Sequence, residues 1–368
     1  MIGSLTDTQK EQFFSGNPKS LTLAFEDGTT LTNEDIIQES MTLTQTVTDT
    51  QNFSLGQVFS SEFRIKIFND GTSYAGKWFS ATIRVTGTSA SLKIGTFKVE
   101  SEKKSNDKLY KDIVAYDALH DVLNTDYAEW HNSLTFPRKL SSYLAVFANH
   151  AGLAYRIEGT LPNADMQINR TFITSTYTGS DVLRCILELT GWFAHIPQTK
   201  QLLIHPIDMM DYSKWQTIPN EAVLLGGLNY EDFVTKQITS VHIRTIDGAT
   251  IGRYPSMGDS GATYYIAGNP LVSGKTSSEL ATIASNILHQ INQLFFHPVT
   301  LNCVGMPWLQ PGDIINCRVD QEVWYYDYPI FNRVLTGINA LRDAYTANGT
   351  EQFTQTINSG NITVQTTT

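Results

Sequence analysis

The sequence predicts an α+β protein that is mainly β, in which two sets of strands flank a central helical region. Three observations support this fold class. Apolar and polar residues alternate in short runs through the first 116 residues, two helix–glycine–strand units follow, and strands then return around one long helix. Only 17% of the residues are charged, and Thr, Ser, Gln, Asn and aromatic residues take their place. This mixture suits β structure, because β-branched and aromatic side chains fit a pleated surface.

The first strand set is predicted to occupy residues 18–116. Its clearest member is Glu62–Phe68, which alternates strictly and is followed by an Asn-Asp-Gly turn. Further strands are expected at residues 19–26, 41–48, 78–86, 91–101 and 112–116. Short strands with regular turn signals indicate a sandwich or a small barrel. Residues 1–17 are polar and are expected to form an ordered arm or a frayed end.

The central region, residues 117–208, is predicted to be α+β. Its most regular stretch is TGSDVLRCILELTGWFAHIPQTKQLLIHPI (178–207), which predicts an amphipathic helix, a glycine stop and a two-stranded hairpin. Ser180 is the expected N-cap, with Asp181 in the first turn, where the helix dipole favours an acid. Gly191 supplies the left-handed stop that helices favour.

A similar unit precedes it, because an apolar helical stripe in residues 140–151 ends at Gly152 and leads into an apolar strand. Two copies do not distinguish a true repeat from a shared supersecondary arrangement. The rest of the region is expected to hold a short helix and irregular chain, at residues 118–123 and 130–137. The predicted core of the region comprises Leu144, Phe147, Val182, Ile186 and Leu187, with Gly152 and Gly191 as the helix stops.

The second strand set is predicted to span residues 209–345. Its strands are expected at residues 222–226, 234–245, 263–267, 299–304, 314–319 and 323–330. Residues 246–261 are rich in Gly, Asp and Ser and are expected to form an exposed loop or arm. Thr276 and Glu279 have the spacing of a capping box at the start of a long helix. Residues 346–368 are mostly Thr, Asn, Gln and Gly, so a stem, a linker or a disordered end is expected.

Motifs of enzymes are missing from the sequence, which has no HExxH, no GxSxG and no GxGxxG. Gly274-Lys275-Thr276 resembles the end of a phosphate loop, but Gly268 lies one residue too far upstream and Thr276 already has a capping role. A pair of carboxylates that meet only in space, as glycoside hydrolases use, stays open. We therefore predict no catalytic residue and no cofactor.

Metal-ligand spacing is missing too. His195 and His205 are expected to be neighbours across the predicted hairpin, where packing or surface roles are commoner than metal binding. Cys185, Cys303 and Cys317 have no ligand spacing and are predicted to be small buried hydrophobes. We therefore predict no metal site.

The formal net charge of −10 argues against a surface that binds nucleic acid through its phosphates. The N-terminal sequence MIGSLTDTQKEQ lacks the basic start and apolar run of a signal peptide. No apolar run approaches the ~20 residues that span a bilayer. We expect a soluble protein that is made in the cytoplasm and has no membrane-spanning segment.

One aromatic cluster near Asp327 is a candidate contact for a partner or a saccharide: Trp324, Tyr325, Tyr326 and Tyr328. Such a cluster on a strand can bind a sugar or another protein. A strand packed on both faces is the commoner arrangement, and the sequence leaves both interpretations open.

Five segments in order, together with the stretch 178–207, resemble one known family. They are SLTLAFEDGTTLTNEDIIQESMTL (20–43), IGTFKVESEKKSNDKLYKDIVAYDAL (94–119), YYIAGNPLV (264–272), PWLQPGDIINC (307–317) and RVLTGINALRDAYTANGT (333–350). The chain resembles the tail-tip hub of long-tailed phages of Gram-positive hosts, which is the N-terminal structural module of tail-associated lysins (the prophage tail endopeptidase family). That module is similar in fold to the baseplate hub of contractile-tailed phages.

This resemblance implies a homotrimer in the virion tail tip, in which two tube-like β domains of each chain form a pseudo-sixfold ring. The ring would continue the tail tube below a hexamer of distal tail protein, with the α+β region outside it. It would open for the tape measure protein and DNA, and receptor-binding or baseplate proteins could join it. A negative charge suits a lumen that repels passing DNA.

Two alternatives remain beside the hub interpretation. A host-binding adhesin would use a saccharide site near the aromatic cluster, and a tail-tip hydrolase would cut the cell wall. Members of the family often carry a C-terminal hydrolase or receptor-binding extension. No such domain is visible after residue 350, so we expect a structural protein and no enzyme.

Overall fold

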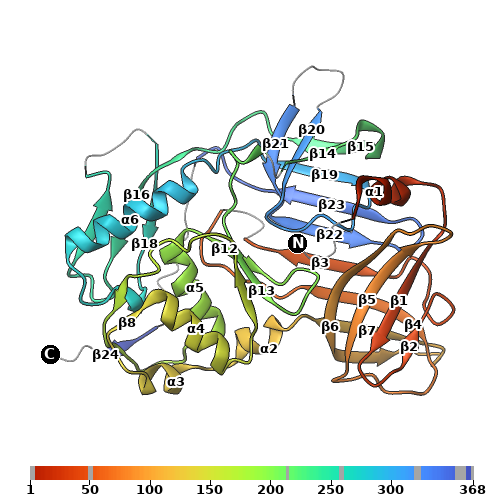
Figure 1. Ribbon diagram of the computed structural model, residues 1–368, viewed down its shortest axis with the longest axis horizontal. Helices are drawn as coiled ribbons and strands as arrows, with labels where there is room; N and C mark the ends of the chain where they lie inside the picture. The colour runs from red at the N-terminus through yellow and green to blue at the C-terminus, as the bar shows by residue number, and fades with distance from the viewer. Residues whose placement is uncertain are drawn as a thin grey trace.

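The computed structural model describes residues 5–48, 53–212, 215–256, 261–318, 325–352 and 362–365. The protein is mainly β, as predicted, and one large sheet of eleven strands runs through it (Figure 1). In Figure 1 the strands of the first half lie on the right, and most of the helical chain lies on the left. The strand order in the large sheet is β15-β19-β23-β22-β3-β4-β7-β6-β5-β1-β2.

The first half contributes seven strands to this sheet. They are β1 (Lys19–Phe25), β2 (Thr30–Leu31), β3 (Thr42–Thr46), β4 (Glu62–Phe68), β5 (Trp78–Val85), β6 (Ser91–Lys104) and β7 (Tyr110–Tyr116). Burial alternates along β4 and β7, because successive side chains of a strand point to opposite faces. The alternation seen in the sequence therefore identified these strands correctly.

The N-terminal residues, expected to be an ordered arm or a frayed end, contain an ordered helix. Asp7–Phe14 forms helix α1, which begins with a capping box between Thr6 and Gln9. Phe13 is fully buried, and its ring meets the edge of Trp308 from the second half. Periodicity missed this helix because it is short and polar. Contacts with distant residues hold it in place.

The central region contains four helices and several short strands. They are α2 (Leu119–Asn124), α3 (Ala128–Ser133), β8 (Arg138–Lys139), α4 (Leu140–His150), β9 (Tyr155–Ile157), β10 (Gln167–Ile168), β11 (Phe172–Ile173), α5 (Gly179–Thr190), β12 (Phe193–His195) and β13 (Leu202–His205). Helix α3 occupies the start of a stretch that was expected to be irregular. Strands β12 and β13 pair as the predicted hairpin.

Helix α5 begins earlier than predicted. Its N-cap is Thr178 and not Ser180, because the Thr178 side chain accepts from the amide of Asp181 and the Asp181 carboxylate accepts from the amide of Thr178. Gly191 ends the helix with φ of +70°, as expected, and Gly152 has φ of +64° after α4.

The side chains named as the core of this region are buried in the structure. Each of the following has no exposed surface: Leu144, Phe147, Val182, Ile186 and Leu187. The face of α5 that carries Arg184 and Glu188 is covered as well. Glu188 is only 8% exposed, and its carboxylate accepts from the Asn269 side chain as well as from Arg184.

The second half adds the remaining strands and one long helix. They are β14 (Trp215–Ile218), η2 (Asn220–Ala222), β15 (Val223–Tyr230), β16 (Ile238–Arg244), β17 (Ile251–Tyr254), β18 (Ala262–Ile266), η3 (Pro270–Val272), α6 (Ser277–Ile291), β19 (Val299–Val304), β20 (Ile314–Arg318), β21 (Tyr325–Pro329), β22 (Asn332–Thr336), β23 (Arg342–Ala347) and β24 (Val364–Gln365). Helix α6 packs against β16 and β17. Strand β17 lies within residues 246–261, which were expected to be a loop, and residues 257–260 are outside the described part.

The C-terminal segment also differs from the expected stem where the structure describes it. Strand β24 pairs antiparallel with β11 of the central region. Ile362, just before it, is 7% exposed. Residues 353–361 and 366–368 lie outside the described residues. No helix within the described ranges is long and apolar enough to cross a membrane.

Two apolar clusters form the interior. One lies among β1 to β7 and also takes in Leu335, Ile338 and Leu341 from the β22–β23 hairpin. The other extends without a break from the central region into the second half, because α5 packs against α6. The central region therefore shares its interior with the second strand set.

Candidate functional site

A network of buried polar side chains lies at the junction between the two halves. Strand β3 of the first half pairs with β22 of the second, with Leu43 opposite Leu335. This pairing joins strands that lie almost 300 residues apart in the sequence into one sheet. Contacts at this junction hold the two halves together.

A buried arginine ties the junction together. Arg333 on β22 is 1% exposed, and its Nε donates to Asp343 Oδ1 at 2.8 Å. Its Nη1 donates to the carbonyl of Leu309 at 2.6 Å and to Gln45 Oε1 on β3 at 3.3 Å. Nη2 reaches the carbonyl of Met306 at 3.3 Å. One guanidinium therefore joins three strands and the loop before β20.

The carboxylate of Asp343, which pairs with Arg333, accepts further hydrogen bonds. Asp343 is 2% exposed, and its Oδ2 accepts from the amide of Met306 at 2.7 Å and from the Tyr345 hydroxyl at 2.9 Å. Burial opposes the charge on Arg333, but the adjacent Asp343 raises the arginine's pKa above its ordinary value. The two side chains therefore form a buried salt bridge. Sequence reasoning missed it, although Arg333 is in phase with the buried Leu335.

A second contact holds the same junction. Glu39, which precedes β3, accepts from the backbone amides of Ile338, Asn339 and Ala340 at 3.0 to 3.2 Å. These residues form the turn between β22 and β23. Consecutive backbone amides of a turn make a good anion site, so the carboxylate fastens this hairpin to the first half.

The two hairpin histidines meet as the sequence predicted. His195 Nδ1 lies 3.1 Å from His205 Nε2, and the rings meet edge to face. Both side chains are buried, with exposures of 4% and 6%.

The structure describes only part of the aromatic cluster near Asp327. Trp324 lies outside the described residues, and so do the side chains of Tyr325 and Tyr326, whose backbone belongs to β21. Tyr328 is 1% exposed, so its ring packs inside the protein. A saccharide contact at this cluster stays a prediction for the other three residues.

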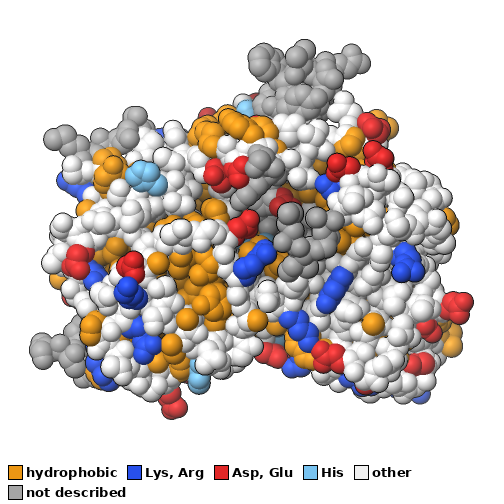
Figure 2. Space-filling view, in the orientation of Figure 1, with side chains coloured by type: hydrophobic (Ala, Val, Ile, Leu, Met, Phe, Trp, Pro, Cys, Tyr) orange, Lys and Arg blue, Asp and Glu red, His pale blue; other side chains and the backbone are white. Residues whose placement is uncertain are grey.

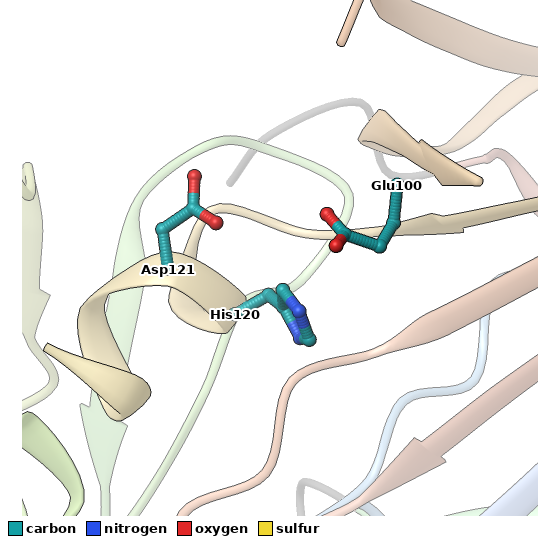
Figure 3. A group of neighbouring side chains, drawn as sticks. All are labelled: Glu100, His120 and Asp121. Carbon is teal, nitrogen blue, oxygen red and sulfur yellow. The ribbon is translucent and has the colours of Figure 1, made fainter. Parts of the chain in front are cut away.

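One cluster of possible ligand atoms lies on the surface at the start of α2. Glu100, His120 and Asp121 place their ligand atoms within 4.8 Å of one another (Figure 3). Asp121 already binds Lys98 at 2.8 Å, and the His120 ring stacks on Tyr116 with centroids 4.1 Å apart. These contacts describe a solvated ion pair beside an aromatic stack.

The remaining sequence candidates have structural roles. Thr276 caps α6 in a reciprocal box with Glu279, as predicted, and Lys275 Nζ lies 3.0 Å from the same glutamate. The cysteines at positions 185, 303 and 317 are free and buried, as predicted. Burial raises the pKa of Cys185 to about 12, so this thiol is a poor nucleophile.

The buried side chain of His131 should make the free energy of unfolding depend on pH. Its Nε2 donates to the carbonyl of Thr171 at 3.0 Å, and its Nδ1 accepts from the Tyr143 hydroxyl at 2.8 Å. Burial lowers its pKa to about 4. As pH falls from about 6.5 to about 4, the unfolded chain takes up this proton first, which removes roughly 3 kcal/mol of stability. The stability difference between wild type and His131→Gln, from urea unfolding, should shrink by this amount over that interval.

Asp117 provides a control of opposite sign. It is 3% exposed, and burial raises its pKa to about 6. The free energy of unfolding of the wild type, relative to an Asp117→Asn variant, should therefore rise as pH falls from about 6 to about 4. Over this interval the folded state binds the proton of Asp117 more readily than the unfolded chain does. A pH-independent difference for His131→Gln would contradict the assignment of a buried neutral histidine.

No protein-family model matches the chain, and no curated protein matches its sequence. Solved structures do match its fold. The tail protein from Neisseria meningitidis MC58 matches with a TM-score of 0.57 over 89% of this chain and 96% of that one, at 10% identity. The 43 kDa tail protein of prophage MuSo2 from Shewanella oneidensis matches with a TM-score of 0.53 over 89% and 97%, at 10% identity. The chain has a phage tail protein fold.

A third match is to another prophage tail protein. The prophage tail protein gp18 from Listeria monocytogenes has the same phage tail protein fold, with a TM-score of 0.51 over 90% of this chain and 94% of that one, at 12% identity. The resemblance inferred from the sequence is thereby confirmed at the level of the fold.

Proposed function

We propose that this protein is a structural component of a phage tail tip, a trimeric hub of the baseplate type. The observation that carries the proposal is the fold match to three tail proteins, which covers 89–90% of this chain and 94–97% of theirs. A match of nearly whole chains supports the same kind of building block, and no motif of an enzyme accompanies it. The role is therefore structural, without catalysis.

In this proposal, the two tube-forming β domains are residues 18–116 and 209–345. The region outside the tube is residues 117–208, and the C-terminal tail or stem of the chain is residues 346–368. Three copies would give a pseudo-sixfold ring. The shared sheet and the buried Arg333 network support this arrangement, because a ring that bears load needs its two domains fixed relative to each other. The interior shared by α5 and α6 would keep the outer region attached.

The partners follow from the position in the tail. The ring would dock on a hexamer of distal tail protein, and it would let the tape measure protein and DNA pass during infection. The charge of −10 supports passage without binding. On the face in Figure 2, Lys and Arg side chains are scattered among acidic ones, and the described side chains there form no basic patch. Such a surface does not hold a polyanion.

The oligomeric state tests the proposal. Size-exclusion chromatography with light scattering should show a trimer, alone or after mixing with a candidate distal tail protein. Electron microscopy of the mixture should show a sixfold-like ring at the end of that hexamer. A stable monomer that joins no ring under either condition would show that the hub assignment is wrong.

A further inference from the structure

A cavity of about 330 Å³ lies where the three regions of the chain meet. The β12–β13 hairpin forms one wall and contributes His195 and His205. Other walls come from α1, from β9 and from the loop before β20, which contributes Trp308 and Gln310. Figure 1 shows the hairpin in the middle of the molecule, between the helices and the large sheet. Clefts between regions of a chain are preferred places for small ligands.

The hydrogen bonds of the two histidines determine which nitrogens carry protons. His205 Nδ1 lies 3.0 Å from the carbonyl of Pro206, which can only accept, so this nitrogen holds a proton. In the neutral ring, His205 Nε2 is then an acceptor, and His195 Nδ1 donates to it. His195 Nε2 is left as a bare acceptor, buried and without a partner among the described residues.

The same cavity contains a second buried acceptor that lacks a hydrogen-bond partner among the described residues. The side-chain Oε1 of Gln310 is buried and has no hydrogen-bond partner in the described part of the chain. Its backbone amide donates to Asp313, which fixes the loop that presents it. Leaving a buried acceptor without a hydrogen bond is unfavourable, because the group has lost its bonds to water and gained none in return. Two of them in one cavity indicate a ligand that donates hydrogen bonds.

The other lining groups narrow the class of ligand. Burial and the neighbouring His205 hold the pKa of His195 well below its ordinary value, so Nε2 is an uncharged acceptor. The described residues place no third metal-ligating side chain close enough to complete a metal site here. The lining contains basic and acidic side chains in nearly equal number, together with side-chain amides. The basic residues are Lys10 and Arg156, the acidic ones Glu158, Asp208 and Asp313, and the amides Gln198 and Gln216. This mixture suits a neutral ligand with many hydroxyl groups.

Trp308 adds an apolar surface to these polar groups. Its ring is fixed edge-on by Phe13 and Phe14 of α1, with centroids 5.8 and 5.7 Å apart. A rigid indole offers a flat face to the C–H surface of a sugar ring, while the hydroxyls of that ring can donate to histidine and amide acceptors. The volume is at the lower end of the range for small-ligand pockets.

We propose that this cavity binds a neutral saccharide unit of hexose size, with His195 Nε2 and Gln310 Oε1 accepting hydrogen bonds from its hydroxyls. The site is distinct from the aromatic cluster near Asp327. It also does not depend on the hub function, because it uses contacts within one chain. A tail-tip protein with such a site would sense sugars of the cell surface through its own interior junction.

Saturation-transfer difference NMR on the full chain tests this proposal with glucose, galactose and N-acetylglucosamine at millimolar concentrations. At least one sugar should receive saturation from the protein. A Gln310→Leu variant keeps the size of the side chain and removes the acceptor, so it should weaken binding of that sugar about tenfold. His195→Phe should do the same, and circular dichroism establishes that both variants are folded.

Gln201→Leu is the matched control, because Gln201 is exposed on the same hairpin and does not line the cavity. It should bind as wild type does. Methylammonium serves as the competing probe, since an ammonium group also donates to bare acceptors. The proposal is wrong if methylammonium binds and the sugars do not, if no sugar binds, or if Gln310→Leu binds as tightly as Gln201→Leu.

Discussion

Replacing Arg333 with methionine should lower the free energy of unfolding by about 3–5 kcal/mol, measured by urea denaturation. The substitution leaves the Asp343 carboxylate buried at 2% exposure without its cationic partner. It also removes donors from the carbonyls of Leu309 and Met306. Because the network joins β3 to β22, the two halves should also lose their fixed arrangement.

Two further variants separate the ion pair from simple loss of packing. Arg342→Met makes the same change at an exposed arginine on the neighbouring strand β23. It should lower the free energy of unfolding by no more than about 0.5 kcal/mol. Arg333→Met combined with Asp343→Asn should be more stable than Arg333→Met alone. The asparagine still accepts from Met306 and Tyr345 but buries no charge.

If Arg333→Met costs no more than Arg342→Met, the network does not hold the junction. If the double variant is no better than the single one, the cost comes from packing and not from an uncompensated charge. In the proposed hub, the same Arg333→Met variant should also form fewer trimers at equal concentration, because each ring contains three such junctions.

Local patterns predicted those elements whose structure is determined by their own residues. Strand β4, the stop at Gly191 and the capping box of Thr276 were all visible from spacing alone. The error at the start of α5 is also local. Asp181 completes a capping box only with a residue three positions before it, and that residue is Thr178.

The remainder depended on contacts between distant residues. Helix α1 is held by Phe13 against Trp308, and the polar face of α5 is buried because Asn269 reaches Glu188. Neither contact leaves a periodic signal. The bare acceptors of the cavity were equally hidden, since only the fold brings His195 and Gln310 to one place. The facing histidines of the hairpin were the part of that site that spacing could reveal.

Contacts between distant residues also determine how the central region unfolds. If the central region were an independent unit, damage to its core should unfold it before the rest of the protein. In the structure, Trp192 Nε1 donates to Gln290 of α6 at 2.9 Å, and the Asn269 side chain donates to the carbonyl of Cys185 at 2.9 Å. These contacts lie over a continuous apolar cluster. The central region and the α6 unit should therefore lose stability together.

Ile186→Asn tests this coupling with a large expected effect. Ile186 has no exposed surface, so the change removes buried apolar volume and buries an amide, with an expected cost of about 4 kcal/mol or more. Hydrogen exchange should speed up in α4, α5 and α6 together, while β4 to β7, which have a separate core, keep their protection. Ile251→Asn, at an exposed position of β17, is the matched control and should change little. Faster exchange confined to α4 and α5, with α6 unchanged, would show that the central region is an independent unit after all.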